Sequence, residues 1–191
     1  ETFLVISGDV LTDIDLGKVI EFHEQSGALA TIGLVHVDNP LEFGIVITRE
    51  DGSIERFLEK PTWGQVFSDT INTGIFVLEP EIFDYIEADR PVDFSSEVFP
   101  ALLADGKPLY GAVAEGYWED VGTLESYVSA HKDVMDGRVV VDVPGFEFGQ
   151  GVWIGEGAEV HPDAKIEGFA IIGENSRVEA GARLGDYTLL G

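Results

Sequence analysis

The stretch IGEGAEVHPDAKIEGFAIIGENSRVEAGARLGDYTLLG, residues 154–191, repeats with a strict period of six. An aliphatic residue returns at every sixth position, and a small residue precedes each later one by two places. The aliphatic positions are Ile154, Val160, Ile166, Ile172, Val178, Leu184 and Leu190, and the small ones are Ala158, Ala164, Ala170, Ser176, Ala182 and Thr188. Hexapeptide periodicity of this kind is typical of a parallel β-helix. We therefore predict a left-handed parallel β-helix whose aliphatic side chains fill a triangular interior.

The residues before this stretch follow a different pattern. Strand-like runs alternate with helical patterns up to residue 138, which is typical of an α/β domain with a mostly parallel sheet. We expect strands over 3–7, 28–37, 45–48, 54–57 and 71–78, and helices over 15–27, 95–103 and from Thr123 onwards. The segment 136–150 contains Pro144 and three glycines and joins the two regions. We therefore predict one domain over 1–138 and a linker with the β-helix over 139–191.

The charge balance restricts the classes of partner. The chain carries 11 Lys and Arg against 36 Asp and Glu, a net charge of −25. Such a field repels polyanions and argues against nucleic-acid binding, and a phosphorylated substrate needs cations placed next to it. The sequence has no cysteine, which removes disulfides and thiolate metal ligands. No apolar run approaches the roughly 20 residues of a membrane span, and no secretory signal is visible, so we expect a cytoplasmic protein.

Two carboxylates follow expected strands in distant parts of the chain. Asp9 comes after Gly8 at the end of the first strand, and Asp120 comes before Gly122 and the helix cap Thr123. Ligands of open α/β sheets bind beyond the carboxyl ends of strands, and carboxylate oxygens suit Mg²⁺. A Gly-Asp pair alone is more often a turn or a helix-capping aspartate than a metal ligand. The hypothesis of a magnesium site therefore depends on both carboxylates meeting.

A third motif, Glu59-Lys60-Pro61, ends another expected strand. Lys60 is a rare cation in an acidic chain, which favours a contact with phosphate, and Glu59 can accept hydrogen bonds from sugar hydroxyls. A surface ion pair at a strand end explains the same two residues. Asn72-Thr73-Gly74 adds amide and hydroxyl groups near a strand start and is uninformative in isolation.

Taken in order, these motifs resemble the sugar-1-phosphate nucleotidyltransferase family. The resemblance covers almost the whole chain and ends in hexapeptide repeats. It runs through Gly8-Asp9, Phe43-Gly44, Glu59-Lys60-Pro61, Asn72-Thr73-Gly74, Glu97-Val98-Phe99-Pro100 and Trp118-Glu119-Asp120-Val121-Gly122-Thr123. Residues 94–103 and Tyr117-Trp118 are most similar to the mannose-1-phosphate guanylyltransferase branch. The resemblance implies a Rossmann-like nucleotidyltransferase domain before the β-helix.

The resemblance also implies roles. Asp9 and Asp120 would hold a catalytic Mg²⁺, Lys60 would contact the sugar-1-phosphate, and Glu59 would bind the sugar hydroxyls. Other residues expected to line the sugar pocket are Gly44, Asn72 and Trp118. The sugar phosphate would attack the α-phosphorus of a nucleoside triphosphate in line and expel pyrophosphate. GTP with mannose-1-phosphate is favoured, UTP or dTTP with glucose-1-phosphate stays open, and we expect a homo-oligomer.

One departure concerns the nucleotide. The family's glycine-rich nucleotide loop, with its arginine and lysine, precedes the Gly-Asp strand, and residues 1–7 contain no such loop. Glu1 begins inside a strand and the repeat stops at Gly191 in mid-pattern, so we expect a fragment of a longer protein. We expect this chain to hold half a site and not to catalyse alone.

Two other classes of protein remain as alternatives. A hexapeptide acyltransferase would use a histidine between prisms as base, but His161 follows an inward aliphatic and is expected to face solvent. A non-catalytic regulatory relative would keep the fold and bind a sugar nucleotide or a partner. Asp9, Lys60 and Asp120 argue against it, but the missing loop keeps it as an alternative. His23 and His131 fall on apolar helix faces and are expected to be packed.

Overall fold

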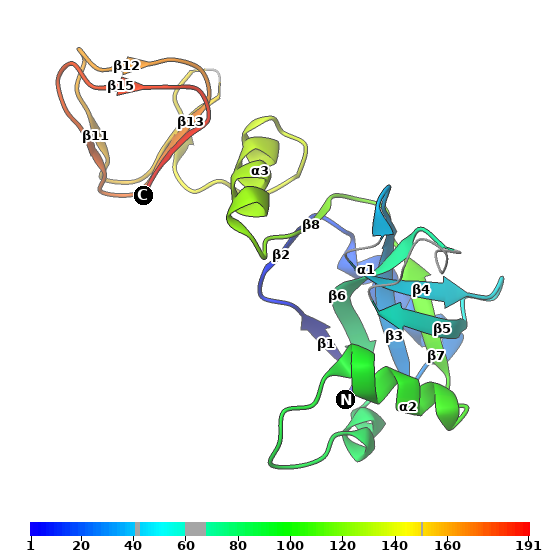
Figure 1. Cartoon of the computed structure of the whole chain (residues 1–191). Helices are drawn as coiled ribbons and strands as arrows, with labels where there is room; N and C mark the ends of the chain where they lie inside the picture. Colours follow the sequence, from blue (N-terminus) through cyan, green and yellow to red (C-terminus); the bar gives the residue numbers. More distant parts are fainter. Residues whose placement is uncertain (41–42, 60–67, 150) are drawn as a thin grey trace. The chain divides into compact units, whose positions relative to one another are not determined.

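The computed structural model describes residues 1–40, 43–59, 68–149 and 151–191. Their contacts form two compact units (Figure 1). The first unit comprises Glu1–Val10 and Ile14–Trp118, and the second comprises Leu11–Asp13 and Glu119–Gly191.

A mixed sheet forms the centre of the first unit, in the order β5-β4-β6-β3-β7 with β1 also paired to β6. Its strands are β1 (Phe3–Ile6), β3 (Ala30–His36), β4 (Gly44–Thr48), β5 (Ile54–Glu59), β6 (Thr70–Leu78) and β7 (Leu109–Val113). Among these described strands only β3 and β7 pair in parallel. The prediction of a mostly parallel sheet is therefore wrong. β4 and β5 are joined by the short turn at residues 49–53, and parallel pairing would require a much longer crossover connection.

Strand β6 pairs with three other strands of this sheet: with β3 along one edge, and with β4 and β1 along the other. Residues Ile75–Leu78 pair with β1 on one edge, and Phe76–Leu78 pair with β3 on the other. Nearer the start of β6, Ile71 pairs with Ile45 of β4 and with Val35 of β3. β4 and β1 therefore share one edge of β6, and the segment between their contacts, residues 72–74, is where the partner changes.

Helices cover both faces of the sheet. α1 (Leu16–Ser26) begins at Asp15, whose carboxylate accepts from Lys18 N, and ends at Gly27 with φ 62°, as predicted. Its Val19 packs with Ile71, Ile75 and Val77 on one face. On the opposite face, Ile32, Phe76 and Leu78 pack with the short helices, which are η4 (Phe94–Val98), a π-helical turn, and α2 (Phe99–Ala104). The helix expected over 95–103 is thus a π turn followed by an α-helix. A 3₁₀ turn, η3 (Pro80–Tyr85), follows β6.

The second unit contains the hexad turns, which coil with three sides in Figure 1. β10 (Val152–Ile154), β13 (Ala170–Ile172) and β16 (Thr188–Leu190) pair in parallel on one side. The other sides are formed by β11 (Glu159–Val160) with β14 (Arg177–Val178), and by β12 (Lys165–Ile166) with β15 (Arg183–Leu184). Ala170, Ile172 and Val178 are buried. The prediction of hexapeptide turns made of short parallel strands is confirmed.

The remaining elements of the second unit precede these turns. α3 (Leu124–Met135) begins with a capping box between Thr123 and Ser126. β9 (Phe146–Glu147) pairs antiparallel with β10. Two short strands, β2 (Val10–Thr12) and β8 (Trp118–Asp120), pair with each other and each begins in the first unit. The predicted apolar face of α3 is largely exposed, with Leu124 at 86%, because Ala130 and Met135 are the residues that pack. His131, expected to be packed, is only partly buried, whereas His23 is buried as predicted.

Candidate functional site

A bulge in β6 lies at the centre of the candidate site. Ile32 pairs with Phe76 and Leu34 pairs with Asn72, so three residues of β6, Thr73–Ile75, face the single Gly33. Gly74 has φ 74°, and a Cβ there would lie 2.5 Å from Ser7 Oγ. Bulges re-aim side chains and are frequent beside functional sites. The Asn72-Thr73-Gly74 motif is therefore a structural irregularity that requires glycine at its third position.

The turn that carries Asp9 is anchored to this bulge. Ser7 N donates to Gly74 O over 3.0 Å, and Val10 N donates back to Ser7 O over 3.3 Å. Asp9 lies inside that turn and is exposed. A Cβ on Gly8 would meet nothing within 4 Å, which leaves open space beside the Asp9 backbone. The end of β1 thus presents a carboxylate at a fixed point next to the bulge.

Trp118 is anchored to the same bulge from another part of the chain. Its Nε1 donates to Thr73 O over 2.9 Å, which uses the only donor of the indole. The ring of Phe43 packs edge-on against it, with centroids 5.4 Å apart. What Trp118 has left for a ligand is ring surface, which suits the apolar face of a sugar.

Asn72 is held by two hydrogen bonds. Its Oδ1 accepts from Gly74 N over 2.9 Å, and its Nδ2 donates to Ser95 Oγ over 2.9 Å. Thr73 Oγ1 donates to Gly33 O over 2.7 Å and closes the opposite side of the bulge. Sequence reasoning assigned no role to Ser95 and missed it. The signal that could have indicated it was its position at the start of the Phe94–Leu103 motif.

The other predicted residues of the first unit lie on the β4–β5 hairpin. Gly44 and Glu59 are direct partners across it, and the following Ile45 pairs with Ile71, the neighbour of Asn72. Lys60 lies outside the described residues. Gly44, Asn72 and Trp118 therefore belong to connected elements of one unit, and the roles given to Glu59 and Lys60 stay predictions.

Asp120 belongs to the second unit, at the end of β8. It is exposed, and its carboxylate lies 3.4 Å from a Cβ built on Gly122. Burial, and then the negative charges of Asp133 and Asp120, raise the pKa of the neighbouring Glu119. Because Asp9 belongs to the first unit, the shared magnesium site of Asp9 and Asp120 stays a prediction. Over the described ranges no group of three or more His, Asp or Glu forms a ready-made metal centre.

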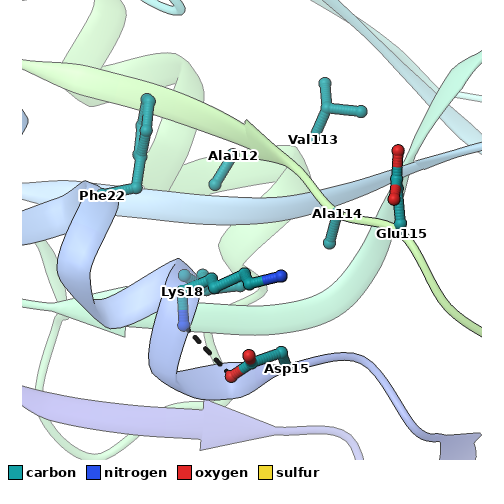
Figure 2. A pocket seen from close by; sticks show the side chains of 8 residues that line it. Asp15, Lys18, Phe22, Ala112, Val113, Ala114 and Glu115 are labelled. Carbon is teal, nitrogen blue, oxygen red and sulfur yellow. Dashed lines mark hydrogen bonds between the residues drawn. The ribbon is translucent and has the colours of Figure 1, made fainter.

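A separate pocket of about 340 Å³ lies between α1 and the end of β7 (Figure 2). Val19, Phe22 and Ala112 form its apolar part, and Lys18 extends between Asp15 and Glu115. None of the predicted site residues lines it. In the described parts of the chain, no helix has the length and apolar character needed to cross a membrane.

Comparison with known proteins assigns both regions of the chain. Residues 1–137 match the nucleotidyl transferase family, and residues 151–186 match the bacterial transferase hexapeptide family with six repeats. A UTP–glucose-1-phosphate uridylyltransferase of Synechocystis sp. is 35% identical over 195 residues, which cover 100% of this chain and 50% of the relative. A mannose-1-phosphate guanylyltransferase of Mycobacterium tuberculosis is 38% identical over 203 residues, covering 95% and 55%. The chain thus spans about half the length of these curated relatives.

Solved structures agree with the fold. The crystal structure of HddC from Yersinia pseudotuberculosis has a TM-score of 0.58 at 25% identity, covering 70% of this chain and 55% of that one. The structure of a candidate glucose-1-phosphate thymidylyltransferase from Bacillus anthracis has a TM-score of 0.61 at 24% identity, covering 75% and 57%. Fold, motif order and sequence identity therefore agree: the chain belongs to the sugar-1-phosphate nucleotidyltransferase family, in the form that continues into hexapeptide repeats.

Proposed function

We propose that this chain supplies the sugar-phosphate and metal residues of an enzyme that transfers a nucleotidyl group from a nucleoside triphosphate to a sugar-1-phosphate. The products are a nucleoside diphosphate sugar and pyrophosphate. The observation that carries this proposal is the β6 bulge, to which Asn72, the Asp9 turn and Trp118 are all tied by hydrogen bonds. These groups offer an amide, a carboxylate and an aromatic ring around one point, a combination suited to a phosphorylated sugar.

Charge neutralisation is the main chemical requirement of the proposed reaction. The reaction brings several phosphate charges together on a chain whose net charge is −25. Asp9 and Asp120 are exposed carboxylates, each at the end of a strand, and their oxygens fit Mg²⁺, which keeps water and phosphate as its remaining ligands. When bound, Mg²⁺ neutralises the charge that develops on the phosphates. Lys60 is proposed to contact the sugar phosphate, and Glu59 to orient the sugar hydroxyls, so that the phosphate oxygen is aligned with the α-phosphorus.

Among the substrates, we propose GTP and mannose-1-phosphate. The guanylyltransferase and uridylyltransferase relatives are 38% and 35% identical to this chain, a difference too small to select a base or a sugar. The preference rests on the motifs at residues 94–103 and Tyr117-Trp118. Glucose-1-phosphate with UTP or dTTP is the alternative within the same chemistry. A regulatory relative that binds a sugar nucleotide without turnover is the alternative outside it.

The test is a substrate matrix on the full-length protein that carries this chain. Pyrophosphate release is measured for GTP, UTP and dTTP against mannose-1-phosphate and glucose-1-phosphate. The proposal predicts the highest kcat/KM for GTP with mannose-1-phosphate. A maximum at UTP or dTTP with glucose-1-phosphate would select the alternative substrates. Binding of sugar nucleotide without turnover in any combination would instead support the regulatory relative.

The contact assigned to Lys60 has a sharper test. Lys60→Ala should raise the KM for the sugar-1-phosphate by about 30- to 150-fold, since a charge-assisted contact contributes on the order of 2–3 kcal/mol. The KM for the nucleotide should change far less. Lys107→Ala removes an exposed lysine elsewhere on the same unit and should leave both constants unchanged. Equal increases for both substrates in Lys60→Ala would contradict the assignment.

A further inference from the structure

The side-chain amide of Asn72 can be oriented without ambiguity. Gly74 N–H is a donor, so the atom of Asn72 that faces it over 2.9 Å must be the oxygen. The nitrogen, Nδ2, then lies 2.9 Å from Ser95 Oγ and donates one of its two hydrogens to it. Within the described residues the second N–H has no protein acceptor, and Asn72 is only partly buried. Asn72 therefore has a donor, not its carbonyl, as its main group for a ligand.

Ser95 belongs to a turn whose position is fixed by polar contacts. The Asp93 carboxylate accepts from Ser96 N over 2.7 Å and from Ser96 Oγ over 2.8 Å. The Glu97 carboxylate accepts from Asp93 N over 3.1 Å and pairs with Arg90 over 2.8 Å. These contacts lower the pKa values of both carboxylates. They leave Ser95 Oγ as the hydroxyl of this turn that reaches β6.

The apolar side of the same turn is equally fixed. Phe94 packs against Phe76 and Phe99, with ring centroids 5.5 Å away in both cases, and Phe57 stacks on Phe99 at 5.8 Å. Phe76 is two residues after Gly74, and Phe57 is two residues before Glu59. One aromatic cluster therefore supports the β6 bulge, the end of β5 and Ser95 together. A displacement of Ser95 relative to Asn72 would have to disturb this cluster.

We propose that Ser95 is a positioning residue, which holds the Asn72 amide so that its free N–H donates to an oxygen of the bound sugar-1-phosphate. This inference rests on the proposed function and names the group that orients its substrate. Without the Ser95 hydroxyl, Asn72 keeps one hydrogen bond, to Gly74. Its side-chain amide can then rotate about the Cβ–Cγ bond, and Nδ2 can turn to water. The substrate then meets a donor that is no longer pre-oriented, so affinity falls while the reacting phosphates are unaffected.

The kinetic test compares Ser95→Ala with Ser96→Ala in the full-length protein. Ser96→Ala removes the neighbouring hydroxyl, whose only bond among the described residues is to Asp93, and keeps the backbone bond to the same carboxylate. Ser95→Ala should raise the KM for sugar-1-phosphate about 3- to 10-fold, the factor expected for one neutral hydrogen bond, with kcat and the nucleotide KM near wild type. Ser95→Thr, which keeps the hydroxyl, should restore the wild-type KM. An unchanged KM in Ser95→Ala overturns the proposal.

A second readout does not depend on turnover. With ¹⁵N-labelled asparagine, the side-chain NH₂ signals of Asn72 are assigned from their loss in Asn72→Ala and followed during titration with mannose-1-phosphate or glucose-1-phosphate. In wild type they should shift with one of these ligands, and Ser95→Ala should weaken that response and speed their exchange with water. If they respond so in a protein without transferase activity, the positioning role stands and the proposed function fails. If they ignore both ligands in an active enzyme, the proposed function stands and the positioning role is wrong.

Discussion

The sheet of the first unit and the hexad turns of the second are both built from short strands, but their positions are specified differently. In the hexad turns each strand pairs with the strand one full turn later, as Val152 does with Ala170 and Ala170 with Thr188. An inward position is therefore inward on every turn. In the sheet, β6 changes partner from β4 to β1 and bulges at the change. The regular region stacks a repeated core, whereas the irregular one gathers different side chains at a single point.

This difference predicts that a charge placed inside the hexad turns has the largest effect on stability. Ile172 is fully buried, so Ile172→Asp should destabilise the second unit by on the order of 4 kcal/mol because an unpaired carboxylate enters an apolar interior. Leu189→Asp is the matched control, since Leu189 is 40% exposed on the outside of the same stack. Thermal unfolding followed by circular dichroism measures both. Equal losses would show that inward and outward positions are not distinguished as described.

The second effect concerns the irregular region and should be about half as large. Gly74→Ala places a methyl group at φ 74° and against Ser7, and should cost about 2 kcal/mol. Gly8→Ala, one residue from Ser7 and with no atom within 4 Å of its Cβ, should cost less than about 0.5 kcal/mol. Urea unfolding of the two variants provides the comparison. If Gly74→Ala is as stable as Gly8→Ala, the bulge does not require glycine and is not a fixed element of the site.

The smallest expected effects concern one carboxylate in each unit, Glu97 and Glu119. Their contributions to folding stability should have opposite signs at neutral pH. The backbone N–H of Asp93 and then Arg90 lower the pKa of Glu97. The contribution of Glu97 to folding stability is therefore fully present well above pH 4.5, the usual pKa of Glu, and is lost as the pH falls through the lowered pKa. Burial and then Asp133 and Asp120 raise the pKa of Glu119. Ionised Glu119 therefore lowers folding stability, and this penalty grows as the pH rises from 4.5 through the raised pKa. At pH 7, Glu97→Gln should lower Tm and Glu119→Gln should raise it, each by about 1–2 °C. Both differences should shrink towards pH 4, and shifts of the same sign would contradict this account.

The two regions also differ in how far sequence alone could predict them. The period of six identified Ile172 as buried, and cap residues located the start and end of α1 at Asp15 and Gly27, because these signals act over a few residues. The bulge at Gly74 and the contact of Ser95 with Asn72 depend on which strand or turn lies alongside. Hydrophobic periodicity reports only which way a side chain faces, so it could not reveal either. The same limit explains why an antiparallel β6 was not foreseen.

The candidate site shows this limit at single residues. The motifs indicated Asn72 and Trp118. They did not indicate that the indole N–H of Trp118 donates to Thr73 O, or that the side-chain carbonyl of Asn72 accepts from Gly74 N. These bonds change what each residue offers a ligand. Trp118 offers its ring face in place of its N–H donor, and Asn72 offers mainly its free N–H in place of its carbonyl. A motif specifies the residue type, whereas the chemistry left for the ligand depends on contacts formed in the fold.

The proposed function has Asp9 and Asp120 serve one magnesium-dependent transfer reaction, which stays a proposal. Its most direct test is pyrophosphate release by Asp120→Asn in the full-length protein over a range of Mg²⁺ concentrations. Asp142→Asn is the control, since Asp142 is an exposed aspartate of the same unit outside the proposed site. We predict that Asp120→Asn abolishes turnover with an unchanged circular dichroism spectrum and melting temperature, that Asp9→Asn does the same, and that Asp142→Asn behaves as wild type. Normal turnover of Asp120→Asn at limiting Mg²⁺ would contradict the proposal.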